Sequence, residues 1–196
     1  MRVLIACEYS GTVREAFRRL GHDAWSCDLL QSDDNSPYHI QGDCTPVIKQ
    51  GWDIIIMHPP CTALAVSGNA HYGTGMAKHN ERLNSIQWTI KLFELAKQYA
   101  AVGVAMENPV GVLPIKATQY IQPYMFGHTE QKKTGLWLHG LPPLVETNNV
   151  YNAMMLLPRN QRERLHFLSP TLDRWKIRST TYQGIADAMA NQWGEL

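Results

Sequence analysis

The stretch that decides the fold is Asp53-Ile54-Ile55-Ile56-Met57-His58-Pro59-Pro60-Cys61-Thr62. Its first five residues form an apolar, largely β-branched run of strand length, and the two prolines end the strand. Such runs are typical of parallel sheets covered on both faces, whose ligands bind at the carboxyl ends of the strands. The sequence therefore places Cys61 where chemistry is expected. A thiolate there would be a strong nucleophile, although a buried, inert thiol fits the same pattern.

A second apolar run ends in the same way. Ala101–Met106 is followed by Glu107-Asn108-Pro109, so a carboxylate follows a strand and a proline stops it. A carboxylate beside a thiol can bind or protonate the substrate that the thiol attacks. Glutamate is more common on the surface, but two such strand ends favour one shared site that contains Cys61 and Glu107.

The first third of the chain alternates strand and helix signals, as a doubly wound α/β fold requires. The long helix has an apolar stripe of Leu83, Ile86, Ile90, Phe93 and Ala96. We expect a mobile loop over 67–79, little regular structure over 145–174, and packing roles for Trp25, Trp52, Trp88 and Trp137. The predicted strands and helices are Arg2–Ala6, Gly11–Leu20, His22–Cys27, Thr45–Gln50, Asp53–Met57, Asn80–Tyr99, Ala101–Met106, Gly135–Leu138 and Gln183–Trp193.

Length and composition predict a single domain over 1–196. The chain has 196 residues, 44% of them hydrophobic, and a net charge of +1, so nucleic-acid binding would need a local basic patch. No apolar run approaches the roughly 18 residues of a membrane span. The four cysteines (Cys7, Cys27, Cys44 and Cys61) lack metal-site or disulfide spacing, so we expect no metal and a cytoplasmic location.

Pro59-Pro60-Cys61 and Glu107-Asn108-Pro109 resemble the paired catalytic motifs of the DNA cytosine carbon-5 methyltransferases. The whole chain is similar to small members of that family, often encoded by phages or prophages. Further matching segments are Ala6-Cys7-Glu8-Tyr9-Ser10-Gly11 and Tyr182-Gln183-Gly184-Ile185-Ala186. The resemblance implies an α/β, Rossmann-like class I S-adenosylmethionine-dependent methyltransferase, with a mostly parallel central sheet and helices on both faces.

The resemblance also implies the chemistry. Cys61 would add to carbon 6 of cytosine, and Glu107 would hold the ring nitrogen and the exocyclic amine while carbon 5 takes the methyl group. In duplex DNA the base must first be flipped out of the helix. Lys132 stands at the first of two positions where relatives carry arginine, with Thr134 at the second, and a solvated basic loop is the alternative. The substrate-binding positions implied are Pro60, Asn108, Pro109 and Lys133.

The implied cofactor is S-adenosylmethionine. The turn after the first strand opens a helix whose free N–H groups favour the donor carboxylate. Asp28 follows the second strand at a spacing suited to ribose hydroxyls, and Asp43 follows the third and could contact the adenine. Both could instead be solvated loop acids. The first loop has only Gly11 where relatives carry more glycines, so Glu8 could take over part of the role. The implied cofactor positions are Glu8, Ser10, Gly11, Asp28, Asp43, Pro59, Gly184 and Ile185.

The region that would recognise the target is short. The resemblance implies that residues at about 145–178 form a reduced target-recognition insert, small for base-specific readout in a groove. Its arginines, with which a local phosphate-binding face is predicted, are Arg159, Arg162, Arg164, Arg174 and Arg178. Relaxed specificity, a single-stranded or nucleotide substrate, and help from a protein partner all remain open, as does the oligomeric state.

Three other functions fit parts of the sequence. The chain could methylate free cytosine nucleotides, or be a catalytically silent relative that binds cofactor or DNA. An amino-methyltransferase is disfavoured, because that class has an aromatic residue after the prolines where this chain has Cys61. Protection of phage or host DNA, as in restriction-modification, is a plausible purpose that no residue specifies.

Overall fold

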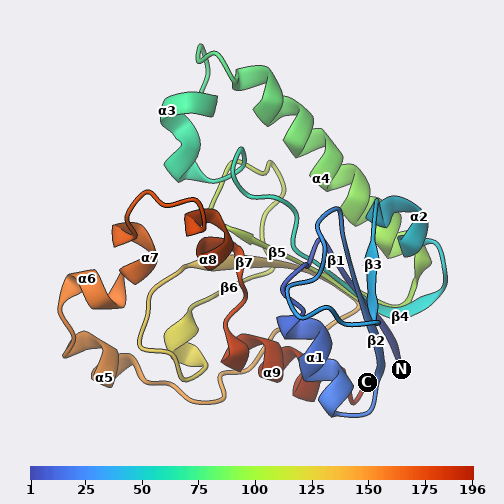
Figure 1. Ribbon diagram of the computed structural model, residues 1–196. Helices are drawn as coiled ribbons and strands as arrows, with labels where there is room; N and C mark the ends of the chain where they lie inside the picture. The colour runs from blue at the N-terminus through green and yellow to red at the C-terminus, as the bar shows by residue number, and fades with distance from the viewer.

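The computed structural model describes residues 1–196. Its centre is one seven-stranded sheet with the order β3-β2-β1-β4-β5-β7-β6 (Figure 1). Strands β1 to β5 pair in parallel, and β7 runs antiparallel to both of its neighbours. The strands are β1 (Arg2–Ala6), β2 (Asp23–Asp28), β3 (His39–Gln41), β4 (Trp52–Met57), β5 (Ala100–Pro109), β6 (Gln119–Ile121) and β7 (Thr134–His139).

Helices cover both faces of the sheet. Figure 1 shows α1 and α9 against one face and α2 and α4 against the other, which confirms the predicted doubly wound architecture. The helices are α1 (Thr12–Arg19), α2 (Cys44–Ile48), α3 (Asn69–Tyr72), α4 (His79–Tyr99), α5 (Tyr151–Met155), α6 (Arg159–Arg162), α7 (Arg164–Phe167), α8 (Arg174–Ser179) and α9 (Gln183–Trp193).

The core has two layers because successive strand residues point to opposite faces of the sheet. In β1, Val3 and Ile5 pack in the layer of α1 and α9, while Leu4 and Ala6 pack in the layer of α2 and α4. Strand β4 alternates in the same way. All of these side chains are fully buried, so both strands are held firmly and their carboxyl ends are fixed in position.

The register of the central strands sets up the site. Ala6, Met57 and Met106 are paired across β1, β4 and β5. His58, which follows Met57, leaves the sheet at its carboxyl edge, whereas Glu107, which follows Met106, lies beside it within β5. The prediction that this strand ends at Met106 is wrong, because the antiparallel β7 pairs with β5 as far as Pro109. Pro59 and Pro60 redirect the chain after His58.

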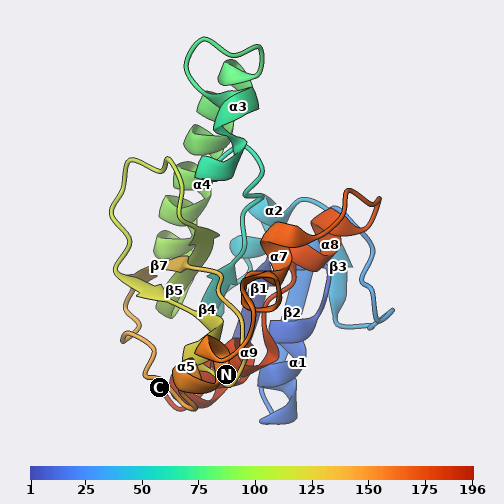
Figure 2. The same cartoon turned by 90° about the vertical axis from the view of Figure 1, so that its left-hand side faces the viewer.

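Helix α4 differs from the prediction in how it is buried. Phe93 and Ala96 are buried as expected, but Leu83 and Trp88 are 44% and 40% exposed. The reason is visible in Figure 2, where α3 and the first turns of α4 project beyond the sheet. That half of the helix has no sheet to pack on, so the packing role predicted for Trp88 is wrong.

The segment predicted as a mobile loop contains ordered structure. A 3-10 turn (Val66–Gly68) leads into α3. The buried Arg82 of α4 holds this segment, because its Nε donates to the Ala63 carbonyl at 2.7 Å and its Nη1 to Asn69 Oδ1 at 2.8 Å. The prediction missed these contacts because they join separate parts of the chain.

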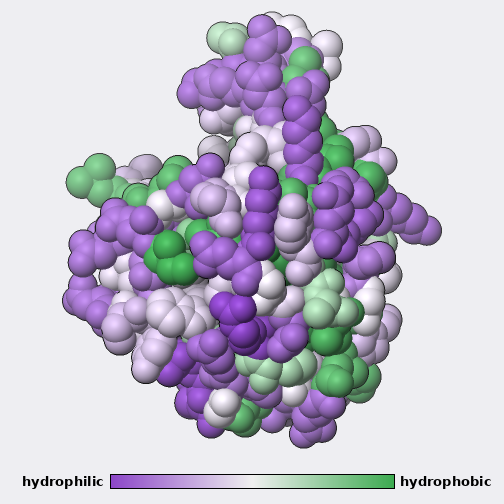
Figure 3. All heavy atoms as spheres, turned by 90° about the vertical axis from the view of Figure 1, so that its right-hand side faces the viewer, coloured by the Kyte–Doolittle hydropathy of each residue, from purple (hydrophilic) through white to green (hydrophobic).

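The expectation of little regular structure over 145–174 is only partly met. Helices α5 to α7 lie here and α8 begins at its last residue, all of them short and at one end of the sheet (Figures 1 and 2). Between residues 155 and 184 only Leu165 is buried, so this segment adds little to the core. The side of the molecule shown in Figure 3 is mostly hydrophilic, with hydrophobic residues in separate patches. None of the helices combines the length and apolar character needed to cross a bilayer.

Candidate functional site

A cavity of about 1120 Å³ opens at the carboxyl ends of β1, β2 and β4. Its sheet side is lined by Cys7, Asp28, His58 and Cys61, and helix α8 forms part of the opposite wall. Asp28 at the end of β2 and the Pro-Pro-Cys turn after β4 therefore face the same cavity. Open α/β sheets bind their ligands in this position.

Cys61 lies in the cavity between opposing charges. Burial raises the pKa of the Cys61 thiol, and the negative charge of Glu107 raises it further. The positive charges of Lys132 and Arg178 act in the opposite direction. Because the thiolate is the nucleophile, these two cations are the groups of the chain that favour the reactive form of Cys61.

The surroundings of Glu107 favour its ionised form. Burial raises its pKa, but the hydrogen bond with His58 and the positive charge of Lys132 more than offset burial, so the pKa lies below its ordinary value. His58 Nδ1 is 3.3 Å from Glu107 Oε2. The Nε2 atom of His58 is buried without a partner. The carboxylate is therefore held as a hydrogen-bond acceptor by His58, which lines the cavity, although Glu107 itself does not.

Asn108 joins the two motifs. Its side chain is buried, and Nδ2 donates to the Pro59 carbonyl at 2.9 Å, while Oδ1 has no partner. This contact fixes the turn that carries Cys61. Pro60 lines the cavity, whereas Asn108 and Pro109 do not, so the structure gives Asn108 a contact with the turn.

The two adjacent lysines are separated by the structure. Lys132 Nζ donates to the Arg178 carbonyl at 3.0 Å, and its charge acts on both Cys61 and Glu107. Lys133 is exposed and its Nζ lies 4.6 Å from the ring centroid of Tyr120. Lys132 is therefore part of the site. Lys133 instead lies over the ring of Tyr120, a residue of the edge strand β6.

The Glu8 side chain occupies the first turn of α1, where the sequence analysis placed the carboxylate of S-adenosylmethionine. It is buried, with Oε1 accepting from the Val13 N–H at 2.7 Å and Oε2 from the Arg14 N–H at 3.3 Å. These N–H groups of α1 are thus taken, and the expectation that they bind the donor carboxylate is corrected. Burial raises the pKa of Glu8, although the charge of His58 and these hydrogen bonds act against it.

The other residues of this loop support the same cap. Ser10 Oγ lies 3.4 Å from Glu8 Oε1. Gly11 has a φ of 73°, and a Cβ there would collide with the guanidinium of Arg14. Both residues shape the turn before α1, and neither lines the large cavity.

The two acidic residues at the ends of β2 and β3 have different surroundings. Asp28 lines the cavity, and its Oδ1 accepts from the Leu30 N–H at 2.9 Å. Burial raises the pKa of Asp28. Asp43 instead caps α2, since its Oδ1 accepts from the Thr45 N–H and hydroxyl, both at 2.8 Å. Only Asp28 is placed to meet a ligand in this cavity.

Gly184 and Ile185 position helix α9. The Gly184 N–H donates to His128 Nε2 at 2.9 Å, and a Cβ at Gly184 would collide with the Phe126 carbonyl. Ile185 is buried in the layer shared with α1. Neither residue lines the cavity, so their predicted contact with the cofactor stays a prediction.

The structure adds residues that sequence reasoning missed. His58 contacts Glu107 and lines the cavity. Tyr9 lies under the C-terminal segment, with its hydroxyl 2.9 Å from Ser179 Oγ and its ring centroid 5.6 Å from that of Trp175. The position of His58 at a strand end could have identified it. The contacts of Tyr9 had no sequence signal, because they join distant parts of the chain.

Comparison with known proteins gives structural neighbours only. No protein-family model matches the chain, and no curated protein matches its sequence. One similar structure is an E. coli protein described as a DNA modification methyltransferase encoded within a prophage. It has a TM-score of 0.50 and 14% identity, over 70% of this chain and 46% of that one.

A second similar structure is a SAM-dependent methyltransferase from Neisseria gonorrhoeae, with a TM-score of 0.39 and 12% identity, over 69% of this chain and 61% of that one. The chain thus spans less than two thirds of either protein. The parallel order of β1 to β5, the antiparallel β7 and the E. coli neighbour agree on the fold. The chain has the Rossmann-like fold of the class I methyltransferases.

Proposed function

We propose that the protein transfers a methyl group from S-adenosylmethionine to carbon 5 of cytosine, with DNA as the acceptor. The observation that carries the proposal is the meeting of Cys61 with Glu107. Cys61 follows β4, and Glu107 lies in the adjacent strand β5, where its carboxylate is 3.3 Å from Nδ1 of His58, a residue that lines the cavity with Cys61. The charge of Glu107 raises the pKa of Cys61. A nucleophilic thiol beside an ionised carboxylate suits an acceptor ring that is attacked at one atom and held by its amine.

The cavity fits this cofactor. Ligand sites commonly measure about 300–1,000 Å³, so a cavity of about 1120 Å³ has room for a donor and an extrahelical base together. The half-buried Asp28 carboxylate can accept hydrogen bonds from ribose hydroxyls, and Leu30 and Trp175 add apolar surface nearby. Bound S-adenosylmethionine would supply an electrophilic methyl group.

The residues of the chain would activate the acceptor. Cys61 Sγ forms a bond to carbon 6, and the electron pair of the ring double bond moves to carbon 5, which becomes nucleophilic. Glu107 accepts a hydrogen bond from the exocyclic amine. Methyl transfer to carbon 5 leaves S-adenosylhomocysteine. The carbon-5 proton then passes to solvent, its bonding electrons re-form the double bond, and Cys61 departs as the thiolate. Lys132 stabilises the thiolate at both ends of this sequence.

Domain organisation is part of the proposal. One methyltransferase domain spans 1–196, and the segment at about 145–178 is a reduced target-recognition insert. Support comes from the position of α5 to α8 at one end of the sheet, and from α8, which forms a wall of the cavity. The small insert agrees with short or relaxed target recognition.

Transfer of labelled methyl groups tests the proposal. Purified protein and tritiated S-adenosylmethionine are incubated with duplex DNA, single-stranded DNA or deoxycytidine monophosphate, and products are separated as nucleosides. We expect 5-methylcytosine, and a loss of at least about a thousandfold in Cys61→Ala. Cys44→Ala, which changes a cysteine outside the cavity, is the matched control. Transfer that survives in Cys61→Ala, or a label on the exocyclic amine, would contradict the proposal.

A further inference from the structure

Two arginines of helix α8 face the cavity without an acidic partner. Arg174 and Arg178 both line it, and their spacing of four residues puts them on one side of the helix. Arg174 Nε is buried without a hydrogen-bond partner. The side chain of Arg178 has a single long contact, 3.5 Å from Nη1 to the Leu165 carbonyl. No carboxylate forms an ion pair with either guanidinium.

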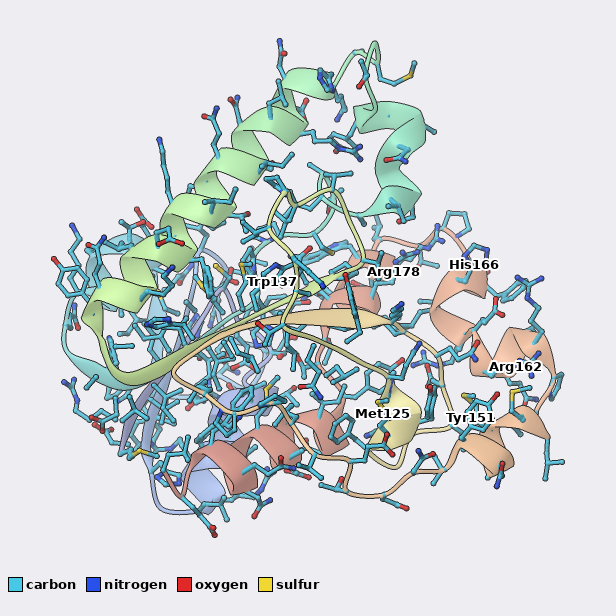
Figure 4. The ribbon with its side chains drawn as sticks, turned by 180° about the vertical axis from the view of Figure 1, so that it is seen from behind. Met125, Trp137, Tyr151, Arg162, His166 and Arg178 are labelled. Carbon is cyan, nitrogen blue, oxygen red and sulfur yellow. The ribbon has the colours of Figure 1, made fainter.

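The other arginines of this segment do not share this arrangement. Arg159 is paired with Glu163 and Arg164 with Glu130, each at 3.0 Å. Arg162 Nη1 lies 3.3 Å from Met155 Sδ, away from the cavity. In Figure 4, Arg178 lies nearer the central sheet than Arg162, which sits among the outer helices. Of the arginines without an acidic partner, Arg174 and Arg178 line the cavity, whereas Arg162, whose Nε is likewise buried without a partner, does not.

A partly desolvated guanidinium without an anion is unfavourable, so this wall is suited to an anionic ligand. The planar donor fork of arginine matches the oxygens of a phosphate group. Arg178 also acts electrostatically on Cys61, which puts the cationic wall at the acceptor end of the cavity. The anion nearest to the base of a nucleotide is its phosphate.

We infer that Arg174 and Arg178 bind the phosphate next to the target cytosine, so that the acceptor is a cytidine phosphate unit and not the bare nucleoside. The identity of the base rests on the proposed function. A free nucleotide and a phosphodiester of DNA share this chemistry, and the arms of the experiment distinguish them. Of the five arginines in the predicted phosphate-binding face, these two form the phosphate site.

Equilibrium binding tests the inference without any methyl transfer. The ligands are deoxycytidine, its 5′-monophosphate, and a single-stranded oligodeoxynucleotide with one cytosine. Because hydrogen bonds to charged groups are strong, we expect Arg174→Ala and Arg178→Ala each to weaken both phosphate-bearing ligands by about tenfold or more. Binding of deoxycytidine stays unchanged. For the oligonucleotide, each variant also reduces the slope of log affinity against log salt by about one.

Arg162→Ala is the matched control, because Arg162 lies in the same segment without an acidic partner but does not line the cavity. Its affinities are expected to equal those of the wild type. Arg178→Lys keeps the charge and should recover part of the lost affinity. Circular dichroism spectra confirm that each variant is folded. Tighter binding of the oligonucleotide identifies a polymer as the source of the phosphate, and equal binding identifies the free nucleotide.

Three results would overturn the inference. They are equal weakening of nucleoside and nucleotide, no weakening of either, and weakened binding of S-adenosylhomocysteine with unchanged nucleotide binding. The last result would assign the guanidinium groups to the donor carboxylate. Phosphate-dependent binding without transfer to carbon 5 contradicts only the proposed function, and transfer without phosphate dependence contradicts only the inference.

Discussion

At the residue scale, the reactivity of Cys61 is set by neighbours of opposite charge. Burial and Glu107 raise the pKa of the thiol, while Lys132 and Arg178 lower it. We therefore expect Glu107→Gln to lower the pKa and Lys132→Met to raise it. At a fixed pH below that pKa, alkylation of Cys61 by iodoacetamide should be several-fold faster in the first variant and several-fold slower in the second. Mass spectrometry of the Cys61 peptide against pH measures both shifts.

Lys133→Met is the matched control, since it removes the same charge from the adjacent, exposed position. Its alkylation profile should overlay that of the wild type. If Glu107→Gln and Lys132→Met move the profile in the same direction, the electrostatic account of the thiol is wrong.

At the element scale, a buried carboxylate caps the first turn of helix α1. Glu8 accepts hydrogen bonds from the N–H groups of Val13 and Arg14. Glu8→Ala leaves both groups unpaired, so we expect the free energy of unfolding to fall by about 1–2 kcal/mol. Urea denaturation followed by circular dichroism measures the change. Glu81→Ala, an exposed acidic residue in the first turn of α4, should change it by less than about 0.5 kcal/mol.

The same carboxyl group makes stability depend on pH. Burial raises the pKa of Glu8 in the folded state, so the folded protein binds a proton at Glu8 more readily than the unfolded chain. The wild type should therefore lose stability relative to Glu8→Gln as the pH rises through that pKa. A free-energy difference between the two proteins that is flat from pH 4 to pH 8 would show that Glu8 is not buried as described.

At the scale of the whole molecule, the sheet and the C-terminal segment differ in how firmly they are held. Between residues 155 and 184 only Leu165 is buried. Helix α8 is joined to the sheet side by Tyr9–Ser179 at 2.9 Å and Lys176–Asp33 at 3.3 Å. We expect the amides of α6 to α8 to exchange with solvent at least about a hundredfold faster than those of β1 and β4.

Hydrogen exchange read by mass spectrometry tests this expectation. Helix α9 is the internal reference, because it follows the segment directly but is buried against α1. Addition of S-adenosylhomocysteine with deoxycytidine monophosphate should slow exchange in α8 and leave α9 unchanged. Equal protection of α8 and β4 in the free protein would contradict the picture of a weakly held cavity wall.

Short-range patterns predicted the central strands well. The predicted strands over Arg2–Ala6 and 53–57 agree with β1 and β4, and α9 was predicted with its observed bounds. Their apolar residues repeat with the period of a strand or helix and are buried in place. The predicted stripe of α4 was wrong near its beginning, because burial there depends on whether the sheet extends beneath the helix, which no local pattern encodes.

At the candidate site, the local sequence was compatible with more than one role for each acidic residue. Asp43 follows a strand just as Asp28 does, yet Asp43 caps α2 and Asp28 lines the cavity. Glu8 stands in the loop assigned to the donor, yet its carboxylate is used by α1. In each case the choice depends on which backbone N–H groups lie within reach, and that distance is fixed only by the folded chain.

The sequence by itself determined the doubly wound α/β fold that follows from alternating strands and helices, and the positions of Cys61 and Glu107 after two buried apolar runs. These features depend on residue periodicity and on proline, which act over a few residues. Only the tertiary structure decided that His58 contacts Glu107, that Lys132 and Arg178 flank the thiol, and that Arg174 faces the cavity. Those contacts join segments far apart in the chain, and packing of the whole fold creates them.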